Sequence, residues 1–385
     1  MIDIKDKKDC CGCTACFNSC PKNCIKMVPD NEGFMYPHID INQCVNCGRC
    51  EKVCPVINKR NNSFERKAYA IRDINQQNLL QSSSGSFFSN LAEYVLNNNG
   101  TVFGAIIDEN HKVCHSRITS VDDINKMRGS KYIQSDLKNI FYSTKKDLCE
   151  GKLVLFSGTP CQIFGLKNFL ANEYENLITI DIVCHGVSSP KLWNKYVCYM
   201  EDKYNSSIIS SNFRYKTYGY HSGTMKLIFA NGKIYYGSAR VDYMLKSFFS
   251  EISSRPSCYS CSFKTNYRIA DFTAFDCWHF EELTGKKDDD KGYTNLIINT
   301  KKGEILFDKI KDRYYYFNID FIKSLDLDGS MYLKSAIPNS KRNLFYDFID
   351  DLPLNQIINK YIPITKKDYF IEKLKKIYYF KKRIK

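Results

Sequence analysis

The sequence has no long hydrophobic run and no secretory leader. No apolar stretch is long enough to span a bilayer, and the charged start MIDIKDKKD contains no signal-peptide hydrophobic region. There is no nucleic-acid recognition motif, and no internal repeat apart from one doubled cysteine pattern. These absences predict a cytoplasmic globular protein that does not act by binding nucleic acid.

Positive charge is plentiful but unevenly spread. The 385 residues carry a formal net charge of +14 and suffice for two domains, or for one large domain with an insert. Residues 366–385 hold nine Lys and Arg against two acidic residues, a net +7 and half of the excess. The rest of the chain is only mildly basic, which favours an acidic partner or a nucleotide cofactor over nucleic acid.

Eight of the 18 cysteines form two copies of the spacing C-x2-C-x2-C-x3-C-P. This run is typical of ferredoxins, in which four thiolates hold a [4Fe–4S] cluster and the fourth Cys of each run ligates the other cluster. A structural zinc site is the alternative, but zinc usually takes two separated C-x2-C pairs. Cys11 and Cys24 lie outside the pattern and are expected to be packed thiols. The predicted ligands are Cys10, Cys13, Cys16 and Cys54 for one cluster, and Cys44, Cys47, Cys50 and Cys20 for the other.

The chain after these runs alternates between strand-like and helix-like segments. Continuous apolar runs at 152–158 and 177–184 are typical of strands buried on both faces of a parallel sheet, and each precedes a helical pattern. Asn231-Gly232 predicts a hairpin, with strand patterns from 206 onward. The predicted architecture is an α+β ferredoxin-like module followed by an α/β domain with added β structure. Its predicted parts are the module at 1–58, a polar linker at 59–67, the α/β domain at 68–335 and a C-terminal extension at 336–385.

Four further cysteines stand where α/β proteins often carry chemistry. Cys161 opens a helix directly after a buried strand, Cys184 ends the next such strand, and Cys258 and Cys261 form a C-x2-C pair. Loops at the carboxyl ends of parallel strands bind ligands in open sheets, so a third [4Fe–4S] site is one interpretation. In a second interpretation, Cys161 and Cys184 are small buried hydrophobic residues. A reactive thiol at Cys161, favoured by the helix N-terminus, is the third.

With these residues in place, the chain resembles the coenzyme F420 hydrogenase/dehydrogenase beta-subunit family up to about residue 300. The double cysteine run resembles the ferredoxin module fused to many members. One position departs from the family pattern, which commonly has Gly-Asp before the aromatic residue of its last motif. Phe275 replaces that glycine, and because Phe avoids positive φ, we expect a different backbone there. The matching segments are 82–95, 128–135, 156–170, 183–193 and 258–278.

The resemblance implies an iron–sulfur flavoprotein with FAD in the α/β domain, beside a cluster held by Cys161, Cys184, Cys258 and Cys261. A Ser/Gly turn that runs into a helix offers backbone N–H groups to a pyrophosphate. The resemblance implies catalytic roles for Lys131, which would complement the phosphates or the flavin, and for His185, which would relay protons. The residues implied to lie near FAD are Ser83, Ser84, Gly85, Ser86, Ser130, Lys131, Tyr132, Gly158 and Thr159.

Structural interpretations of these residues remain open. The SSSGS turn is an ordinary capped loop on sequence grounds alone. Lys131 is then a solvated surface lysine, and His185 is a structural residue. Arg268, Asp271 and Asp276 either build an ion-pair network around the site or hold the fold.

The hypothesis is an enzyme, an FAD- and [4Fe–4S]-dependent oxidoreductase. It would pass electrons between a partner protein, such as ferredoxin or an oxidoreductase subunit, and a small molecule. The composition, poor in Gly and rich in Asn, Lys and Tyr, resembles members encoded beside polysaccharide-synthesis enzymes, so a polysaccharide-related pathway is the context we favour. The alternatives are a non-catalytic electron-transfer subunit of a larger complex, or a true coenzyme F420 reductase or dehydrogenase.

The end of the chain has the pattern of a basic amphipathic helix. We expect its apolar face to pack on the domain and its lysines to remain in solvent; peripheral contact of 366–385 with an anionic membrane, or with a partner, is the alternative. The apolar positions are Phe370, Ile371, Leu374, Ile377, Tyr378 and Phe380.

Overall fold

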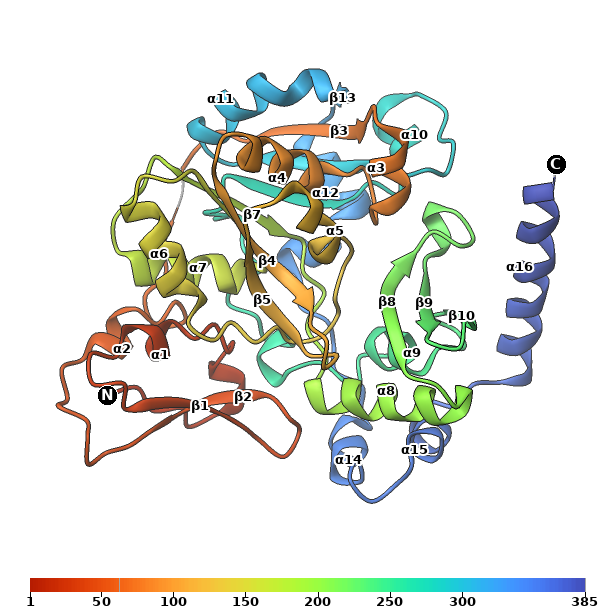
Figure 1. Ribbon diagram of the computed structural model, residues 1–385, viewed down its shortest axis with the longest axis horizontal. Coiled ribbons are helices and arrows are strands. Elements are labelled where there is room, and N and C mark those ends of the chain that lie inside the picture. The colour runs from red at the N-terminus through yellow and green to blue at the C-terminus, as the bar shows by residue number, and fades with distance from the viewer. Residues whose placement is uncertain (62, 385) are drawn as a thin grey trace.

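The computed structural model describes residues 1–61 and 63–384, the last five of these by their backbone alone. Its strands form sheets of two, three and eight strands. Figure 1 shows the two-stranded sheet below one end of the eight-stranded sheet, and the three-stranded sheet on the opposite side of the molecule. No helix in this described part of the chain is both long and apolar enough to cross a membrane.

The N-terminal module contains an antiparallel pair of strands and a short helix inside each cysteine run. The helices begin after Thr14 (φ 59°) and Gly48 (φ 71°), both in the left-handed region. These turns reverse the chain at equivalent points of the two runs, so the module has two similar halves. Its elements are η1 (Lys7–Asp9), α1 (Ala15–Ser19), β1 (Ile25–Pro29), β2 (Met35–Ile39) and α2 (Arg49–Lys52).

The central sheet has the strand order β13-β3-β12-β11-β7-β6-β4-β5. β4, β6, β7 and β11 are parallel, and antiparallel strands flank them on both sides. The continuous apolar runs thus form buried parallel strands, as predicted. The strands are β3 (Lys67–Asp73), β4 (Thr101–Ile107), β5 (Val113–Ile118), β6 (Val154–Gly158), β7 (Leu177–Ile182), β11 (Phe272–Asp276), β12 (Thr294–Ile298) and β13 (Tyr314–Asn318).

Helices cover both faces of this sheet. Side chains along a strand point alternately to opposite faces, so the apolar strands place side chains in a core on each side. In β6, Leu155 packs in the cluster that contains α4, α5 and α11, whereas Phe156 packs in the cluster that contains α6 and α7. The helices are α4 (Phe87–Asn97), α5 (Ile124–Met127), α6 (Ile140–Cys149), α7 (Pro160–Leu170) and α11 (Lys301–Ile310).

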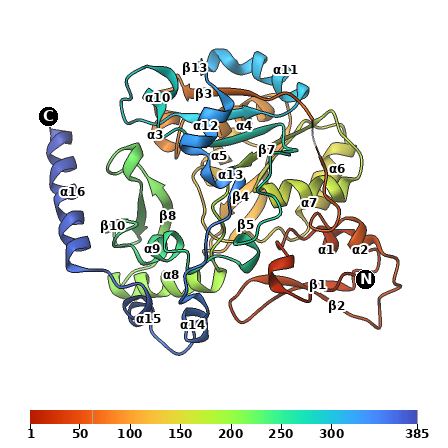
Figure 2. The ribbon, with the colours of Figure 1, turned by 180° about the vertical axis from the view of Figure 1, so that it is seen from behind.

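The three-stranded sheet and its helices enclose a separate hydrophobic core. Asn231-Gly232 forms the predicted hairpin turn between its second and third strands. The last helix, α16, runs along the outer edge of this unit in both views (Figures 1 and 2). The elements are α8 (Pro190–Tyr204), β8 (Ile208–Tyr215), β9 (Thr224–Phe229), β10 (Ile234–Ser238), α9 (Tyr243–Phe249), α14 (Arg342–Asp347), α15 (Leu354–Tyr361) and α16 (Lys366–Ile384).

The helix that follows the serine turn begins at Phe87. Ser86, at φ 71°, breaks the helical path, and a separate helix precedes the serine turn. The remaining short elements are α3 (Gln76–Gln81), η2 (Val121–Asp123), η3 (Tyr220–Ser222), η4 (Pro256–Cys258), α10 (Phe280–Thr284), η5 (Lys311–Arg313), α12 (Phe321–Asp328) and α13 (Ser330–Leu333).

The N-terminal module packs directly against the α/β domain. A Cβ at Gly165 of α7 would lie 2.9 Å from the Cβ and Sγ atoms of Cys13, so this approach requires glycine. Arg342 forms a bidentate ion pair with Glu32, with N–O distances of 2.9 and 2.5 Å. Both side chains are largely buried. The first cysteine run is therefore held against α7, the helix that carries Cys161 in its first turn.

Candidate functional site

The eight cysteines of the N-terminal module surround two cavities. Each fourth cysteine follows the short helix of its own run, and it lies against the cavity of the other run. The crossed grouping expected from the spacing is therefore the grouping seen in space, although ligation itself remains a prediction. One cavity is lined by Cys10, Cys13, Cys16 and Cys54, and the other by Cys20, Cys44, Cys47 and Cys50.

The two cysteines outside the runs also lie against these cavities. Cys24 is buried, lines the second cavity, and has its Sγ 3.3 Å from that of Cys20. Cys11 lines the first cavity and also a third one, inside the α/β domain. Both were expected to be packed thiols. Cys11 in addition lies between the first and third cavities and lines both. Only tertiary contacts reveal that position.

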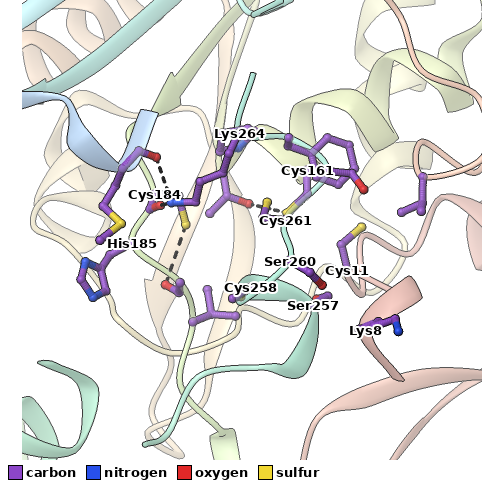
Figure 3. Close-up of a pocket in the computed structure, with 18 of the residues that line it drawn as sticks. Lys8, Cys11, Cys161, Cys184, His185, Ser257, Cys258, Ser260, Cys261 and Lys264 are labelled. Carbon is purple, nitrogen blue, oxygen red and sulfur yellow. Dashed lines mark hydrogen bonds between the residues drawn. The ribbon is translucent and has the colours of Figure 1, made fainter. Parts of the chain in front are cut away.

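The third cavity collects the other four candidate cysteines (Figure 3). Cys161 lies in the first turn of α7, directly after β6, and Cys184 follows β7. Because β6 and β7 are parallel neighbours, their carboxyl ends bring these two thiols to one edge of the sheet. Cys258 and Cys261 come from the loop that begins at η4. Thr159 and His185 also line the cavity.

Burial and mutual proximity raise the pKa values of these thiols. Burial, together with the neighbouring thiols of Cys161 and Cys261, raises the pKa of Cys184 to about 12. A hydrogen bond with Cys11, followed by burial, raises the pKa of Cys161. Metal ligation requires thiolates, so four ionised sulfurs here need positive charge close by, which iron supplies.

The charges around the cysteine-lined cavities indicate whether these residues suit an iron–sulfur cluster. No three His, Cys, Asp or Glu side chains of the described residues converge as the ligands of a single metal ion do. A cubane makes a different demand, because each thiolate binds its own iron. Arg255 supplies the second observation. It is fully buried, its Nε donates to the Cys10 carbonyl oxygen at 2.8 Å, and its Nη2 has no hydrogen-bond partner among the described residues.

The charge of Arg255 favours an anionic neighbour. No ion pair with a carboxylate is found for it in residues 1–61 and 63–384. Its guanidinium instead lies 4.0 Å from the Tyr36 ring centre and acts electrostatically on Cys161. Burying an uncompensated cation is costly. Thiolate-bound clusters in the first and third cavities would offset that cost, so these residues fit such clusters.

The serine turn expected near FAD is braced against the central sheet. Ser84 Oγ lies 2.8 Å from Thr294 Oγ1, which also accepts a hydrogen bond from the Gly85 N–H at 2.8 Å. A Cβ at Gly85 would lie 2.3 Å from the Ile71 carbonyl oxygen, which explains the glycine. The Ser130 N–H donates to Ser83 Oγ at 3.3 Å. Two of the segments assigned to FAD therefore touch each other.

Lys131 has a structural role in these contacts. Its Nζ donates to the carbonyl oxygens of Met127 and Arg128, each at 2.9 Å, and to that of Lys126 at 3.3 Å, which closes the end of α5. Burial lowers the pKa of Lys131 to about 7. A direct contact with a flavin would require the amine to release one of these carbonyl groups.

Aromatic side chains link Tyr132 to the third cavity. The Tyr132 ring stacks on Phe248 with ring centres 4.6 Å apart, and the His185 ring centre lies 5.0 Å from that of Phe248. His185 Nε2 pairs with the Glu251 carboxylate. The segment predicted to contact FAD and the segment that carries Cys184 therefore share one packed cluster. Gly158, which ends β6, is followed by Thr159 at the cavity wall.

The three charged residues of the last motif separate into different interactions. Arg268 pairs with Asp181 at 3.5 Å, and Asp271 accepts hydrogen bonds from the Thr179 N–H and hydroxyl at 2.8 Å. These contacts join the segment before β11 to β7, which supports the structural interpretation of Arg268 and Asp271. Asp276 instead faces β8.

Two basic residues at the end of β8 were missed by the sequence analysis: Arg214 lies in the strand and Lys216 directly follows it. Arg214 forms an ion pair with Asp276, and its guanidinium lies 4.5 Å from the Trp278 ring centre. Lys216 Nζ donates to the Ser84 carbonyl oxygen at 2.9 Å, and burial lowers its pKa to about 7. Two basic residues close together at the end of a strand pattern were the available signal. Phe275 and Asp276 lie in β11, and a backbone different from that of the family at this position stays a prediction.

Comparisons with known proteins agree with this arrangement. Residues 9–58 match the model of the 4Fe-4S dicluster domain, and residues 151–319 match that of the C terminus of the coenzyme F420 hydrogenase/dehydrogenase beta subunit. The chain is similar to this beta-subunit family over residues 151–319. Its N-terminal module is accordingly a [4Fe–4S] dicluster domain, and the second match contains Cys161, Cys184, Cys258 and Cys261.

Individual relatives cover different parts of the chain. The coenzyme F420-dependent sulfite reductase of Methanocaldococcus jannaschii is 25% identical over 79% of this chain and 46% of its own length. A ferredoxin of Streptomyces griseus is 42% identical over 14% of this chain and 41% of its own length. The chain thus spans about half the length, or less, of these two relatives. A chain of the F420-reducing [NiFe] hydrogenase complex of Methanosarcina barkeri aligns with a TM-score of 0.46 and 17% identity, over 78% of this chain and 92% of that chain.

Proposed function

We propose that the protein is an iron–sulfur flavoprotein oxidoreductase that exchanges electrons with a redox protein and reduces or oxidises a small molecule. The observation that carries the proposal is the third cavity. Cys161, Cys184 and the 258–261 loop meet there from separate parts of the chain, beside the dicluster domain. When bound, the clusters would carry single electrons, and FAD would convert them to hydride transfer.

The residues between the first and third cavities support electron exchange between the two sites. Cys11 lines both cavities, and its thiol hydrogen-bonds with those of Cys13 and Cys161. Cys13 and Cys161 are proposed ligands of different clusters, so one partly buried thiol would separate the two ligand sets. Val56 also lines both cavities and helps to exclude water from the contact. The module and the α/β domain therefore form a continuous buried path.

The flavin part of the proposal rests on the braced turn at 83–86 and its contact with Ser130. The turn leads into the N-terminus of α4, where backbone N–H groups and the helix dipole favour a pyrophosphate. His185, which pairs with Glu251 at the wall of the third cavity, is the residue proposed to hold a proton near the reacting groups. The amines of Lys131 and Lys216 donate to backbone carbonyl oxygens. An anion that replaced those carbonyl groups as the acceptor would receive positive charge from both lysines.

The small molecule and the partner are proposed by chemical class only. A deazaflavin is the substrate that the names of the relatives suggest, and a polysaccharide precursor is the one that the composition favours. The partner is a ferredoxin or an oxidoreductase subunit, which would accept or donate single electrons at the dicluster domain.

Metal and flavin counts on anaerobically purified protein test the proposal. We expect about twelve irons and one FAD per chain if three cubanes form, since each holds four irons. The double variant Cys161→Ser/Cys258→Ser should lose about four irons and keep the dicluster signal. Cys198→Ser, which removes an exposed thiol of α8, is the matched control and should lose none.

The contrary outcomes are distinct. Eight irons with FAD, unchanged in the double variant, would contradict the third cluster and retain the flavoenzyme. Eight irons without flavin, even after reconstitution with FAD, would contradict the oxidoreductase proposal and favour an electron carrier.

A further inference from the structure

The C-terminal helix α16, Lys366–Ile384, docks on the three-stranded sheet through a polar face. The Glu372 carboxylate is buried, and it accepts hydrogen bonds from the Ser238 hydroxyl at 2.6 Å and the Tyr218 hydroxyl at 3.2 Å. The Tyr379 ring lies 5.5 Å from that of Tyr218. A buried carboxylate without these donors would be costly, so the contacts determine which side of the helix faces the protein.

The opposite face of α16 exposes large apolar side chains. Phe370 and Tyr378 are 62% and 61% exposed, and Leu374 and Ile377 are 49% and 47% exposed. Their spacing of i, i+4, i+7 and i+8 puts all four on one side of the helix. The expectation that this face packs on the domain is therefore wrong for these four residues. Ile371 is partly buried, and the side chain of Phe380 lies outside the described residues.

Lysines flank this apolar stripe. Lys366 and Lys367 lie one turn before Phe370, Lys373 directly precedes Leu374, and all three lysines are exposed. The last twenty residues hold nine Lys and Arg against two acidic residues, and the buried carboxylate of Glu372 faces inward. The outward surface of α16 is therefore apolar, and the exposed Lys366, Lys367 and Lys373 make it positive as well. A second copy of this helix would bring the same charge and be repelled.

We propose that the outer face of α16 binds an anionic lipid surface. Helices that lie in the interfacial plane combine an apolar stripe with flanking lysines, and anionic headgroups attract such helices. Phe370, Leu374 and Ile377 would enter the acyl boundary while the lysines contact phosphates. The helix forms the outer edge of the molecule (Figures 1 and 2), so the rest of the protein leaves its outer face accessible. The inference does not depend on the proposed redox function.

Vesicle sedimentation with the full-length, anaerobically purified holoprotein tests this proposal. We expect binding to phosphatidylcholine vesicles that contain phosphatidylglycerol, little binding to pure phosphatidylcholine, and release at high salt. The variant Phe370→Ser/Leu374→Ser/Ile377→Ser keeps the charge and should bind at least about tenfold more weakly. A matched control, Ile305→Ser/Ile337→Ser/Leu344→Ser, removes exposed apolar residues elsewhere and should bind as the wild type does.

A second variant separates the contribution of charge. Lys366→Gln/Lys367→Gln/Lys373→Gln should weaken binding to the anionic vesicles by about fivefold per lysine at low salt. Iron content and circular dichroism establish that each variant is folded. Equal binding of the wild type and the apolar variant, or no binding to anionic vesicles, would overturn the proposal. If the wild type forms a dimer and the apolar variant does not, the outer face of α16 binds a second copy of the chain. That result would also overturn the lipid-binding proposal.

Discussion

Removing the charge of Arg255 should lower the reduction potentials of the clusters proposed beside it. This buried guanidinium donates to the Cys10 carbonyl oxygen and acts electrostatically on Cys161, which are proposed ligands of two different clusters. A reduced cluster carries one more negative charge than its oxidised form, so a nearby cation stabilises the reduced form. Arg255→Met keeps much of the apolar stem and removes the cation, whereas Arg255→Lys keeps a positive charge.

The size of the shift follows from the separation of the charges. Arg255 Nε lies 2.8 Å from the Cys10 carbonyl oxygen. The Cys10 sulfur is a few ångströms farther along the same residue, so a separation of about 8 Å and an effective dielectric constant of about 20 correspond to about 2 kcal/mol. For a one-electron couple, that energy equals about 90 mV. A cluster at twice the separation should shift by about 45 mV.

A dye-mediated redox titration, followed by electron paramagnetic resonance, measures these potentials. We expect Arg255→Met to shift one or two couples downward by about 45 to 90 mV, and Arg255→Lys to shift them much less. Full iron content in both variants establishes that the clusters are still bound. Potentials in Arg255→Met within about 10 mV of the wild type would refute the assignment of Arg255 as their counter-charge.

Two further predictions concern stability. Arg342→Met breaks the largely buried bidentate pair with Glu32 and should lower the unfolding free energy by about 3–5 kcal/mol, whereas Lys7→Met breaks the more exposed pair with Asp30 and should cost at most about 1 kcal/mol. Anaerobic urea denaturation compares them, and equal costs would contradict the proposed tie between module and domain. Burial raises the pKa of Asp242 from 3.8 to about 6, so the folded protein binds this proton more tightly, and its contribution makes stability fall as pH rises across that interval. Asp242→Asn should remove this pH dependence, which amounts to about 3 kcal/mol of unfolding free energy across the interval. An unfolding free energy of the variant that depends on pH as the wild type's does would contradict the assignment.

Local patterns were sufficient wherever the interaction itself is local. Each cysteine run carries three thiols on one short turn of chain, and the two runs lie close enough in sequence for the fourth Cys of each to cross over. The grouping of Cys20 and Cys54 with the opposite runs could therefore be predicted from spacing. Periodicity likewise predicted β6, β7 and the helices after them, because a strand buried on both faces must be apolar throughout.

Predictions that needed long-range contacts were less complete. The composition of the third cavity was only one of three interpretations for Cys161, because its partners lie 23 to 100 residues away along the chain. Lys131 looked like a surface or cofactor residue, yet it closes a helix end through three carbonyl groups. Arg255 had no sequence signal at all, since its burial beside Cys10 depends on how the dicluster domain packs.

The sequence by itself determined the two cysteine runs, the parallel strands and the amphipathic character of the last helix, because each follows from spacing along one segment. The tertiary structure alone decided the shared position of Cys11, the charge environment of Arg255 and the outward direction of Phe370. That direction depends on the buried Glu372 carboxylate, whose hydrogen-bond donors, Tyr218 and Ser238, lie more than 130 residues earlier in the chain. Periodicity identifies the two faces of a helix, but only the partners of the buried face determine which one meets solvent.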